Sequence, residues 1–166
     1  MSINGVNVGA DTASGVFVGR FLHTLDPKRR LTIPSGWREQ MGLPARPARE
    51  TPGYVFVMPD VHKRCLCIFP PKDFQQRMER LRQRAVTDLR AAEFSRQLGA
   101  VSEYLPLDVQ GRIRIRDKLL AFAGLTSGVV MIGAFTRIEL WTPERNPEPE
   151  TIDLETLAEV SQGMEF

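Results

Sequence analysis

Cysteine and histidine are scarce in this 166-residue chain, which has two of each, and the shortage excludes several kinds of site. Cys65 and Cys67 alternate along an apolar run, where a disulfide between residues i and i+2 of a strand is geometrically awkward. His62 is the only histidine nearby, so a zinc site would lack ligands. We therefore expect buried or half-buried thiols, no metal site and no cofactor.

Long hydrophobic segments are also missing. The longest apolar runs, such as residues 55–58 and 129–134, fall far short of the roughly 20 residues that cross a bilayer. Residues 1–14 carry no basic residue before their first apolar positions, and so lack the regions of a secretory signal. These absences predict a cytoplasmic protein with no membrane partner and a disordered leader over residues 1–15.

Signatures of catalysis are absent as well. The chain has no phosphate-cradling Gly-rich loop, no Gly-x-Ser-x-Gly and no carboxylate and histidine pair that recurs at a plausible spacing. His23 lies in a run of strand formers and is better interpreted as a strand residue than as a general base. We expect no enzymatic activity and no small-molecule substrate.

The charge distribution indicates a polyanionic partner. The net charge is only +2, but residues 144–166 hold seven acids and one base, which leaves 21 bases against 13 acids in residues 1–143. Of the 22 basic residues, 18 are arginine, which makes bidentate contacts with phosphate and guanine. The basic body therefore favours a nucleic-acid partner.

One short pattern occurs twice, at residues 25–33 and 107–115, with an offset of 82. Each copy reads Leu-Asp-x-x-x-Arg and then alternates apolar and polar residues. The Asp stands where an extended segment turns, and the Arg opens a strand whose apolar residues share one face. The repeat predicts two equivalent turns that each carry an arginine.

Helices and strands follow the same repeat. Alternation and turn residues predict strands at 16–25, 31–34, 54–58, 64–69, 101–107, 113–115, 129–133 and 137–141. Apolar spacing of three and four residues predicts helices at 36–41, 72–98, 117–123 and 152–160. Ser35 is the expected N-cap of the helix at 36–41. The helix at 72–98 is expected to break, with Thr87 or Asp88 as the N-cap of its second half and Gly99 at its end.

The elements therefore form two copies of strand, turn, strand, short helix and hairpin. A unit of roughly 40 residues rarely makes a stable core alone, so the two copies are expected to pack together. A pseudo-twofold axis between them would present Arg30 and Arg112 to one ligand, such as a DNA duplex. The arginines of the long helix are expected to form a solvated face, with a DNA-tracking or subunit-facing role as the alternative.

Several segments of the sequence resemble the MraZ family over roughly residues 16–142. They are Phe21–Pro34 with Trp37-Arg38-Glu39, Leu107–Ile113, Ala123-Gly124-Leu125 and Ile138–Trp141. The resemblance implies an α+β, mostly β protein made of duplicated AbrB-like swapped-hairpin, double-psi-like barrel units with flanking helices. It further implies a ring-shaped homo-oligomer that binds repeats of double-stranded DNA in its own promoter, as a nucleoid-associated regulator of the division and cell-wall gene cluster.

The expected domain division follows from the repeat and the resemblance. It comprises a leader (1–15), a first AbrB-like repeat (16–71), a helical connector (72–100), a second AbrB-like repeat (101–142) and an acidic, partly helical tail (143–166).

The two turns supply the candidate site. The residues expected to contact DNA are Lys28, Arg29, Arg30, Gln110, Arg112 and Arg114, with Asp26 and Asp108 shaping the turns. The alternative is that each Asp and Arg form an ion pair that only stabilises its turn. In function, the alternative is an oligomeric scaffold or antitoxin-type module that binds protein.

Three positions depart from the family pattern. Arg29 stands where the family usually has Gly, Leu120 where it has Arg in the following helix, and Arg116 where the second copy would be expected to have Pro. If the first position needs a positive φ, Arg29 is strained or its turn differs from the second.

Overall fold

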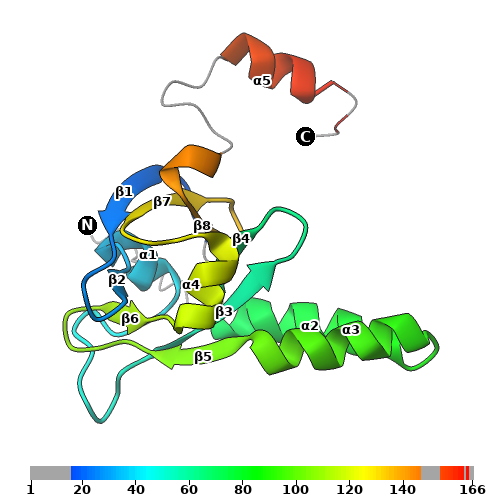
Figure 1. Ribbon diagram of the computed structural model, residues 1–166, viewed down its shortest axis with the longest axis horizontal. Coiled ribbons are helices and arrows are strands. Elements are labelled where there is room, and N and C mark those ends of the chain that lie inside the picture. Colours follow the sequence, from blue (N-terminus) through cyan, green and yellow to red (C-terminus); the bar gives the residue numbers. More distant parts are fainter. Residues whose placement is uncertain (1–15, 147–153, 163, 165–166) are drawn as a thin grey trace, which may run out of the picture.

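The computed structural model describes residues 16–146, 154–162 and 164, so the predicted leader and part of the predicted tail lie outside the described residues. The chain is α+β (Figure 1), and one order of elements occurs twice. The first copy is β1 (Arg20–Thr24), β2 (Arg30–Thr32), α1 (Ser35–Gln40), β3 (Tyr54–Asp60) and β4 (Cys65–Phe69). The second copy is β5 (Glu103–Pro106), β6 (Arg112–Arg114), α4 (Asp117–Ala123), β7 (Gly128–Gly133) and β8 (Ile138–Trp141). Helices α2 (Pro71–Ala85) and α3 (Leu89–Val101) join the copies, and η1 (Pro143–Arg145) and α5 (Leu154–Val160) follow them.

The two copies are interlaced through their strands. Six strands form an antiparallel sheet in the order β1-β7-β8-β4-β3-β5, which is symmetric about its centre between β8 and β4. The first strand of each copy pairs with the hairpin of the other, β1 with β7 and β5 with β3. Strands β2 and β6 pair with each other as a separate antiparallel ribbon. Neither copy therefore completes its strand pairing alone.

The core lies under this β2–β6 ribbon. Leu31 and Ile113 face each other across the ribbon and are fully buried, together with Ile33 and Ile115 just beyond it. They belong to one hydrophobic cluster with Ile68 and Leu140 of the central strands and with apolar residues of α1 and α4. Because apolar residues alternate along each strand, the opposite face of the ribbon is left to polar side chains.

Helices α2 and α3 form an arm that projects from the β3 end of the sheet (Figure 1). Phe74 of α2 stacks on Phe56 of β3 with ring centroids 3.7 Å apart, which anchors the base of the arm. The predicted second cap is confirmed at Asp88, whose Oδ1 accepts from the N–H of Arg90 at 2.9 Å. The two helices of the arm have 15 and 13 residues, so the chain contains more helix than the expected mostly β protein. No helix of the described residues has the length and apolar character needed to cross a membrane.

Several predicted boundaries are wrong, including the first strand, which covers only Arg20–Thr24 of the predicted residues 16–25. Ser35 is the first residue of α1 and not its cap, because Pro34 holds the N-cap position and no side chain caps the helix. Gly99 does not end α3, which runs on to Val101 because the turn to extended backbone comes only at Ser102. Strand β3 continues through Pro59 to Asp60, where the Asp60 carboxylate accepts two backbone N–H groups of the following turn.

The ribbon is expected to be a main support of the fold. Ile113→Ala removes a fully buried side chain beneath it and should lower the free energy of unfolding by about 2–5 kcal/mol. Val109→Ala, at a position 57% exposed in the adjacent turn, is the matched control and should change it by about 0.5 kcal/mol or less. Urea denaturation of both variants tests the expectation, and equal effects would contradict it.

Candidate nucleic-acid interface

The two repeated turns have the same hydrogen-bonded geometry. In the first turn (residues 26–30), Asp26 Oδ1 accepts from the N–H groups of Lys28 and Arg30, both at 2.9 Å. In the second turn (residues 108–112), Asp108 Oδ1 accepts from the N–H groups of Gln110 and Arg112 at 2.9 and 3.0 Å. An Asp side chain that bonds backbone two residues on is a preferred way to close a turn. The expected turn-shaping role of both Asp residues therefore has a direct structural basis.

Each Asp also holds the arginine that ends its turn. Asp26 Oδ2 accepts from Arg30 Nε at 2.5 Å, and Asp108 Oδ2 accepts from Arg112 Nε at 2.7 Å. Arg112 also donates to the side chain of Gln110, and its Nη1 lies 3.8 Å from Asp26 Oδ2, which links the two turns. Both arginines are half-buried, and each uses its Nε to hold the Asp of its turn. The orientation of both guanidinium groups is therefore fixed before any ligand binds.

The outer face of the β2–β6 ribbon is basic. Arg30 lies directly opposite Arg114, and Thr32 lies opposite Arg112, on the face away from buried Leu31 and Ile113. Like charges opposite each other destabilise a strand pair unless another group compensates them. Asp26 and Asp108 compensate Arg30 and Arg112, while Arg114 is exposed and forms no ion pair within the described part of the chain.

The difference between the two tips has a structural explanation. Gly111 has φ +75° and Arg29 has φ +61°, so both tips use the left-handed conformation and Arg29 is strained. A Cβ on Gly111 would lie 2.6 Å from the guanidinium carbon of Arg38, which donates through Nε to the Ile33 carbonyl. The offset of 82 pairs Arg38 with Leu120, which has no guanidinium. The departures at Arg29 and Leu120 are therefore coupled. Helix α4 has Leu120 in place of an Arg, which allows a side chain at the first tip.

The remaining predicted contact residues differ in how free they are. Lys28 and Gln110 are exposed at the two tips. Arg29 is exposed but its Nε lies 3.3 Å from Asp117 Oδ1 of α4. Arg116, two residues beyond Arg114, is exposed, but its Nε lies 2.9 Å from Oε1 of buried Glu103. Lys28 and Arg114 are thus the predicted cations with no ion pair among the residues that the structure describes.

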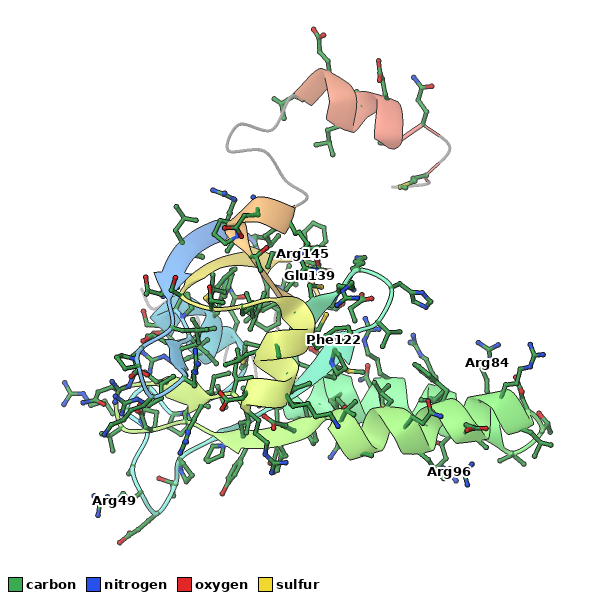
Figure 2. The ribbon with its side chains drawn as sticks, in the orientation of Figure 1. Arg49, Arg84, Arg96, Phe122, Glu139 and Arg145 are labelled. Carbon is green, nitrogen blue, oxygen red and sulfur yellow. The ribbon has the colours of Figure 1, made fainter. Side chains whose placement is uncertain are left out.

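Two further arginines beside the second turn were missed from sequence. They belong to residues 45–53, whose composition predicts a loop and nothing more. Gly53 in that loop accepts from the N–H of Leu107 at 3.0 Å, and the Ala45 carbonyl accepts from Arg38, which packs on Gly111. These contacts place exposed Arg46 and Arg49 on the side of the second turn, and Figure 2 shows Arg49 at the outer end of the loop. Only long-range contacts revealed this, because the loop has no pattern of its own.

Hydrogen bonding keeps both turn carboxylates ionised. Partial burial opposes ionisation of Asp26 and Asp108, but the backbone and guanidinium donors of Arg30 and Arg112 outweigh it and lower both pKa values from the ordinary 3.8. Each turn therefore holds its charge and its shape throughout the neutral range.

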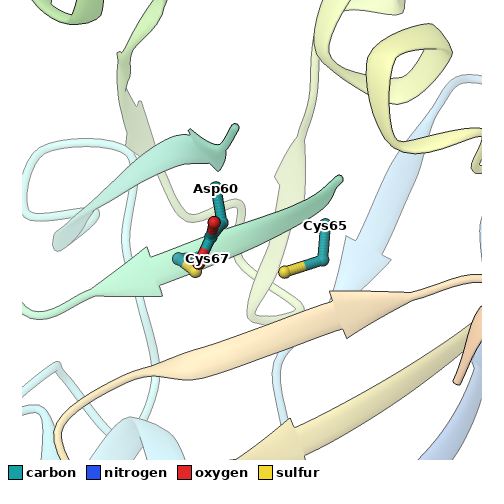
Figure 3. A group of neighbouring side chains, drawn as sticks. All are labelled: Asp60, Cys65 and Cys67. Atoms are coloured by element: carbon teal, nitrogen blue, oxygen red, sulfur yellow. The ribbon is translucent and has the colours of Figure 1, made fainter. Parts of the chain in front are cut away.

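A second cluster of polar side chains lies away from the turns. Figure 3 shows Asp60, Cys65 and Cys67, with ligand atoms within 4.8 Å of one another. Both cysteines are buried free thiols, which confirms that prediction. The hydrogen bond to Cys67, burial and nearby carboxylates raise the pKa of Cys65, so its reactive thiolate form is disfavoured. We interpret this cluster as part of the packing.

The fold and the turns define a small α+β protein with a basic ribbon, and the known proteins that it resembles are named as transcriptional regulators. Residues 101–146 match the family model described as "MraZ protein, putative antitoxin-like". The chain is 31% identical over 146 residues to Transcriptional regulator MraZ of Clostridium tetani, covering 87% of this chain and 95% of that protein. It is 35% identical over 150 residues to Transcriptional regulator MraZ of a Parafrankia species, covering 89% and 95%. The relative from Kineococcus radiotolerans is 36% identical over 129 residues, covering 76% and 80%. The chain belongs to the MraZ family.

The strain at the first tip predicts opposite effects of two substitutions. Arg29→Gly should raise the free energy of unfolding by about 0.5–1 kcal/mol, because glycine adopts φ +61° without strain and the exposed pair with Asp117 contributes little. Gly111→Ala should lower it by about 1–3 kcal/mol, since it adds both strain and the clash with Arg38. Thermal and urea unfolding measure both, and Gly111→Ala should cost less in an Arg38→Leu background than in the parent.

The turn carboxylates predict a pH dependence. Because the folded-state pKa of Asp26 and Asp108 is lowered, the unfolded state binds more protons at low pH. Their contribution to stability is fully present above the unfolded value near pH 4 and is lost as pH falls through the folded-state values. The Asp26→Asn/Asp108→Asn protein should be less stable at pH 7 and lose less stability between pH 5 and 2. Parallel acid titration curves for variant and parent, followed by circular dichroism, would refute this.

Proposed function

We propose that this protein is a sequence-specific, double-stranded DNA-binding transcriptional regulator that acts without enzymatic activity. The observation that carries the proposal is the outer face of the β2–β6 ribbon, where Arg30, Arg112 and Arg114 project between two arginine-bearing turns. The family relationship supports the same role, since its curated members are named transcriptional regulators.

The shape of the basic surface suits a DNA groove. The major groove of B-DNA admits a two-stranded β-ribbon, and arginine bonds the O6 and N7 atoms of guanine there. Asp26 holds Arg30 through Nε, which leaves the terminal amino groups of Arg30 for a base contact, whereas Arg112 is held by Asp108 through Nε and also donates to Gln110 through Nη2. An arginine fixed in this way loses little side-chain freedom on binding.

The exposed cations take the backbone contacts in this proposal. Lys28 and Arg29 at the first tip, and Arg46 and Arg49 beside the second, flank the ribbon and are all exposed. At the second tip, Gln110 is uncharged, and in this proposal it contacts a base and not a phosphate. Phosphate contacts of this kind set position and affinity, while base contacts set sequence.

The proposal includes the assembly and setting implied by the family. The interlaced copies, with β1 on β7 and β5 on β3, support an AbrB-like swapped-hairpin unit in each half, within the domain division 16–71, 72–100 and 101–142. Several such chains form a ring-shaped homo-oligomer that binds repeats in the protein's own promoter, at the nucleoid in the cytoplasm. Its targets are the genes of the division and cell-wall cluster.

A DNA shift assay tests the proposal at Arg114, whose exposed side chain forms no ion pair among the described residues. Arg114→Ala should lower affinity for a fragment of the protein's own upstream region by about tenfold, given about 1–3 kcal/mol per guanine contact. Arg90→Ala on the arm removes the same charge away from the ribbon and should leave affinity unchanged. In the parent, log affinity should fall against log salt by about 0.9 per phosphate neutralised.

Two results separate the alternatives. Equal binding by Arg114→Ala, Lys28→Ala and parent proteins would exclude the ribbon as the DNA surface. No salt-dependent shift with any upstream fragment would favour the scaffold or antitoxin-type module that binds protein.

A further inference from the structure

A cleft lies between the arm and the β3–β4 hairpin. It has a volume of about 560 Å³, and its apolar walls include Met78 and Leu81 of α2, Phe94 of α3 and Met58 and Phe69 of the sheet. Phe69 also packs against the base of the arm, which closes the inner end of the cleft. A cavity of this size with mostly apolar walls is typical of a small-molecule site.

Arginines border the apolar side of α2. Arg77, Arg80 and Arg84 line the cleft together with Leu81. At 3.6 residues per turn, Arg77 and Arg84 lie within about 60° of Leu81 around the helix axis. The control position Arg96 differs, since Figure 2 shows Arg84 and Arg96 on opposite sides of the arm. The charged and apolar side chains of α2 therefore face the same space and can contact one ligand.

Two of these arginines have no acidic partner. Arg80 and Arg84 are exposed, lie one helical turn apart and form no ion pair within the part of the chain that the structure describes. Arg77 differs from them, because its guanidinium lies over the ring of Phe69, 4.8 Å from the centroid. Guanidinium groups bind phosphate and carboxylate through paired, charge-assisted hydrogen bonds. Arg80 and Arg84 thus form a place for one anionic group at the outer part of the cleft.

The other charged side chains of the cleft are already engaged. Nζ of Lys63 and Nη2 of Arg137 lie 3.2 and 2.6 Å from Oε1 of buried Glu139. Asp60 is the one carboxylate among the described residues that line the cleft, and its Oδ1 accepts two backbone N–H groups of the hairpin turn at 3.1 Å. The positive charge at the outer part of the cleft is therefore left for a ligand.

We propose that this cleft binds a free amphipathic anion, an alkyl or acyl chain that ends in a phosphate or a carboxylate. The chain lies against Met78, Leu81 and Phe94, and the anionic group lies between Arg80 and Arg84. Because the inner end is closed, a chain enters end-on, whereas a docked protein helix needs a groove that is open at both ends. The apolar walls are recessed, so a bilayer lipid would have to leave its membrane to reach them. This site goes beyond the proposed regulation of transcription and does not depend on DNA binding.

Calorimetric titration of the full-length protein with dodecyl phosphate, below its micelle concentration, tests the site. Binding should saturate at one ligand per chain. Arg80→Ala/Arg84→Ala should weaken it by about tenfold or more, since one charge-assisted hydrogen bond accounts for roughly that factor. Phe94→Ala, at a position 43% exposed, should also weaken it, because part of the apolar wall is removed.

Matched controls separate charge from chain. Arg90→Ala/Arg96→Ala makes the same charge change on α3 outside the cleft and should bind dodecyl phosphate like the parent. Dodecanoate should bind at the same site, whereas inorganic phosphate and dodecyltrimethylammonium, which lack the chain or the negative charge, should give no saturable heat.

Several outcomes overturn the inference. Equal affinity of the parent and of a folded Arg80→Ala/Arg84→Ala protein, as judged by circular dichroism, would exclude the cleft, and so would no saturable binding of either dodecyl compound. Sedimentation with phosphatidylglycerol vesicles that is lost in the same variant would assign the arginines to a membrane surface. A change of oligomer mass in that variant, measured by light scattering, would mean that another copy of the chain covers the cleft.

Discussion

The antiparallel pairing of β2 with β6 is the constraint on which the rest of the structure depends. It joins the two copies at their shared axis, with the Ile33 N–H bonded to the Gly111 carbonyl and the Ile115 N–H to the Arg29 carbonyl, both at 3.1 Å. The same three-residue strands bury Leu31 and Ile113 on one face and present arginines on the other. Stability and the candidate DNA surface therefore come from one short ribbon, and neither can be changed freely without the other.

The two turns show how one geometry is reached with unequal residues. Asp26 and Asp108 close them with the same hydrogen bonds, so the conformation belongs to the Asp and the backbone and not to the tip residue. The tip position then depends on a distant helix. The Arg38 guanidinium would have to move if Gly111 carried a side chain, whereas the residue equivalent to Arg38 by the offset of 82 is Leu120. The first turn thereby gains a cation and carries the strain of a positive φ.

The basic residues of the chain are divided between separate surfaces. The β2–β6 ribbon and the arginine-bearing arm of α2 and α3 lie on different parts of the molecule (Figure 1). A net charge of only +2 is consistent with such a division between surfaces.

The sequence alone determined the duplication, most element positions and the turns that begin at Asp26 and Asp108, because these depend on local periodicity and turn chemistry. Helix α4 was predicted to the residue, and the cap at Asp88 is one of the two positions predicted for it. Tertiary structure alone decided which strands pair across the copies, that Arg116 pairs with Glu103, and that Arg46 and Arg49 lie beside the second turn. These are contacts between residues far apart in the chain, and no local pattern encodes them. The interaction of Arg38 with Gly111 has the same origin, since 73 residues separate a side chain from the backbone position that it restricts.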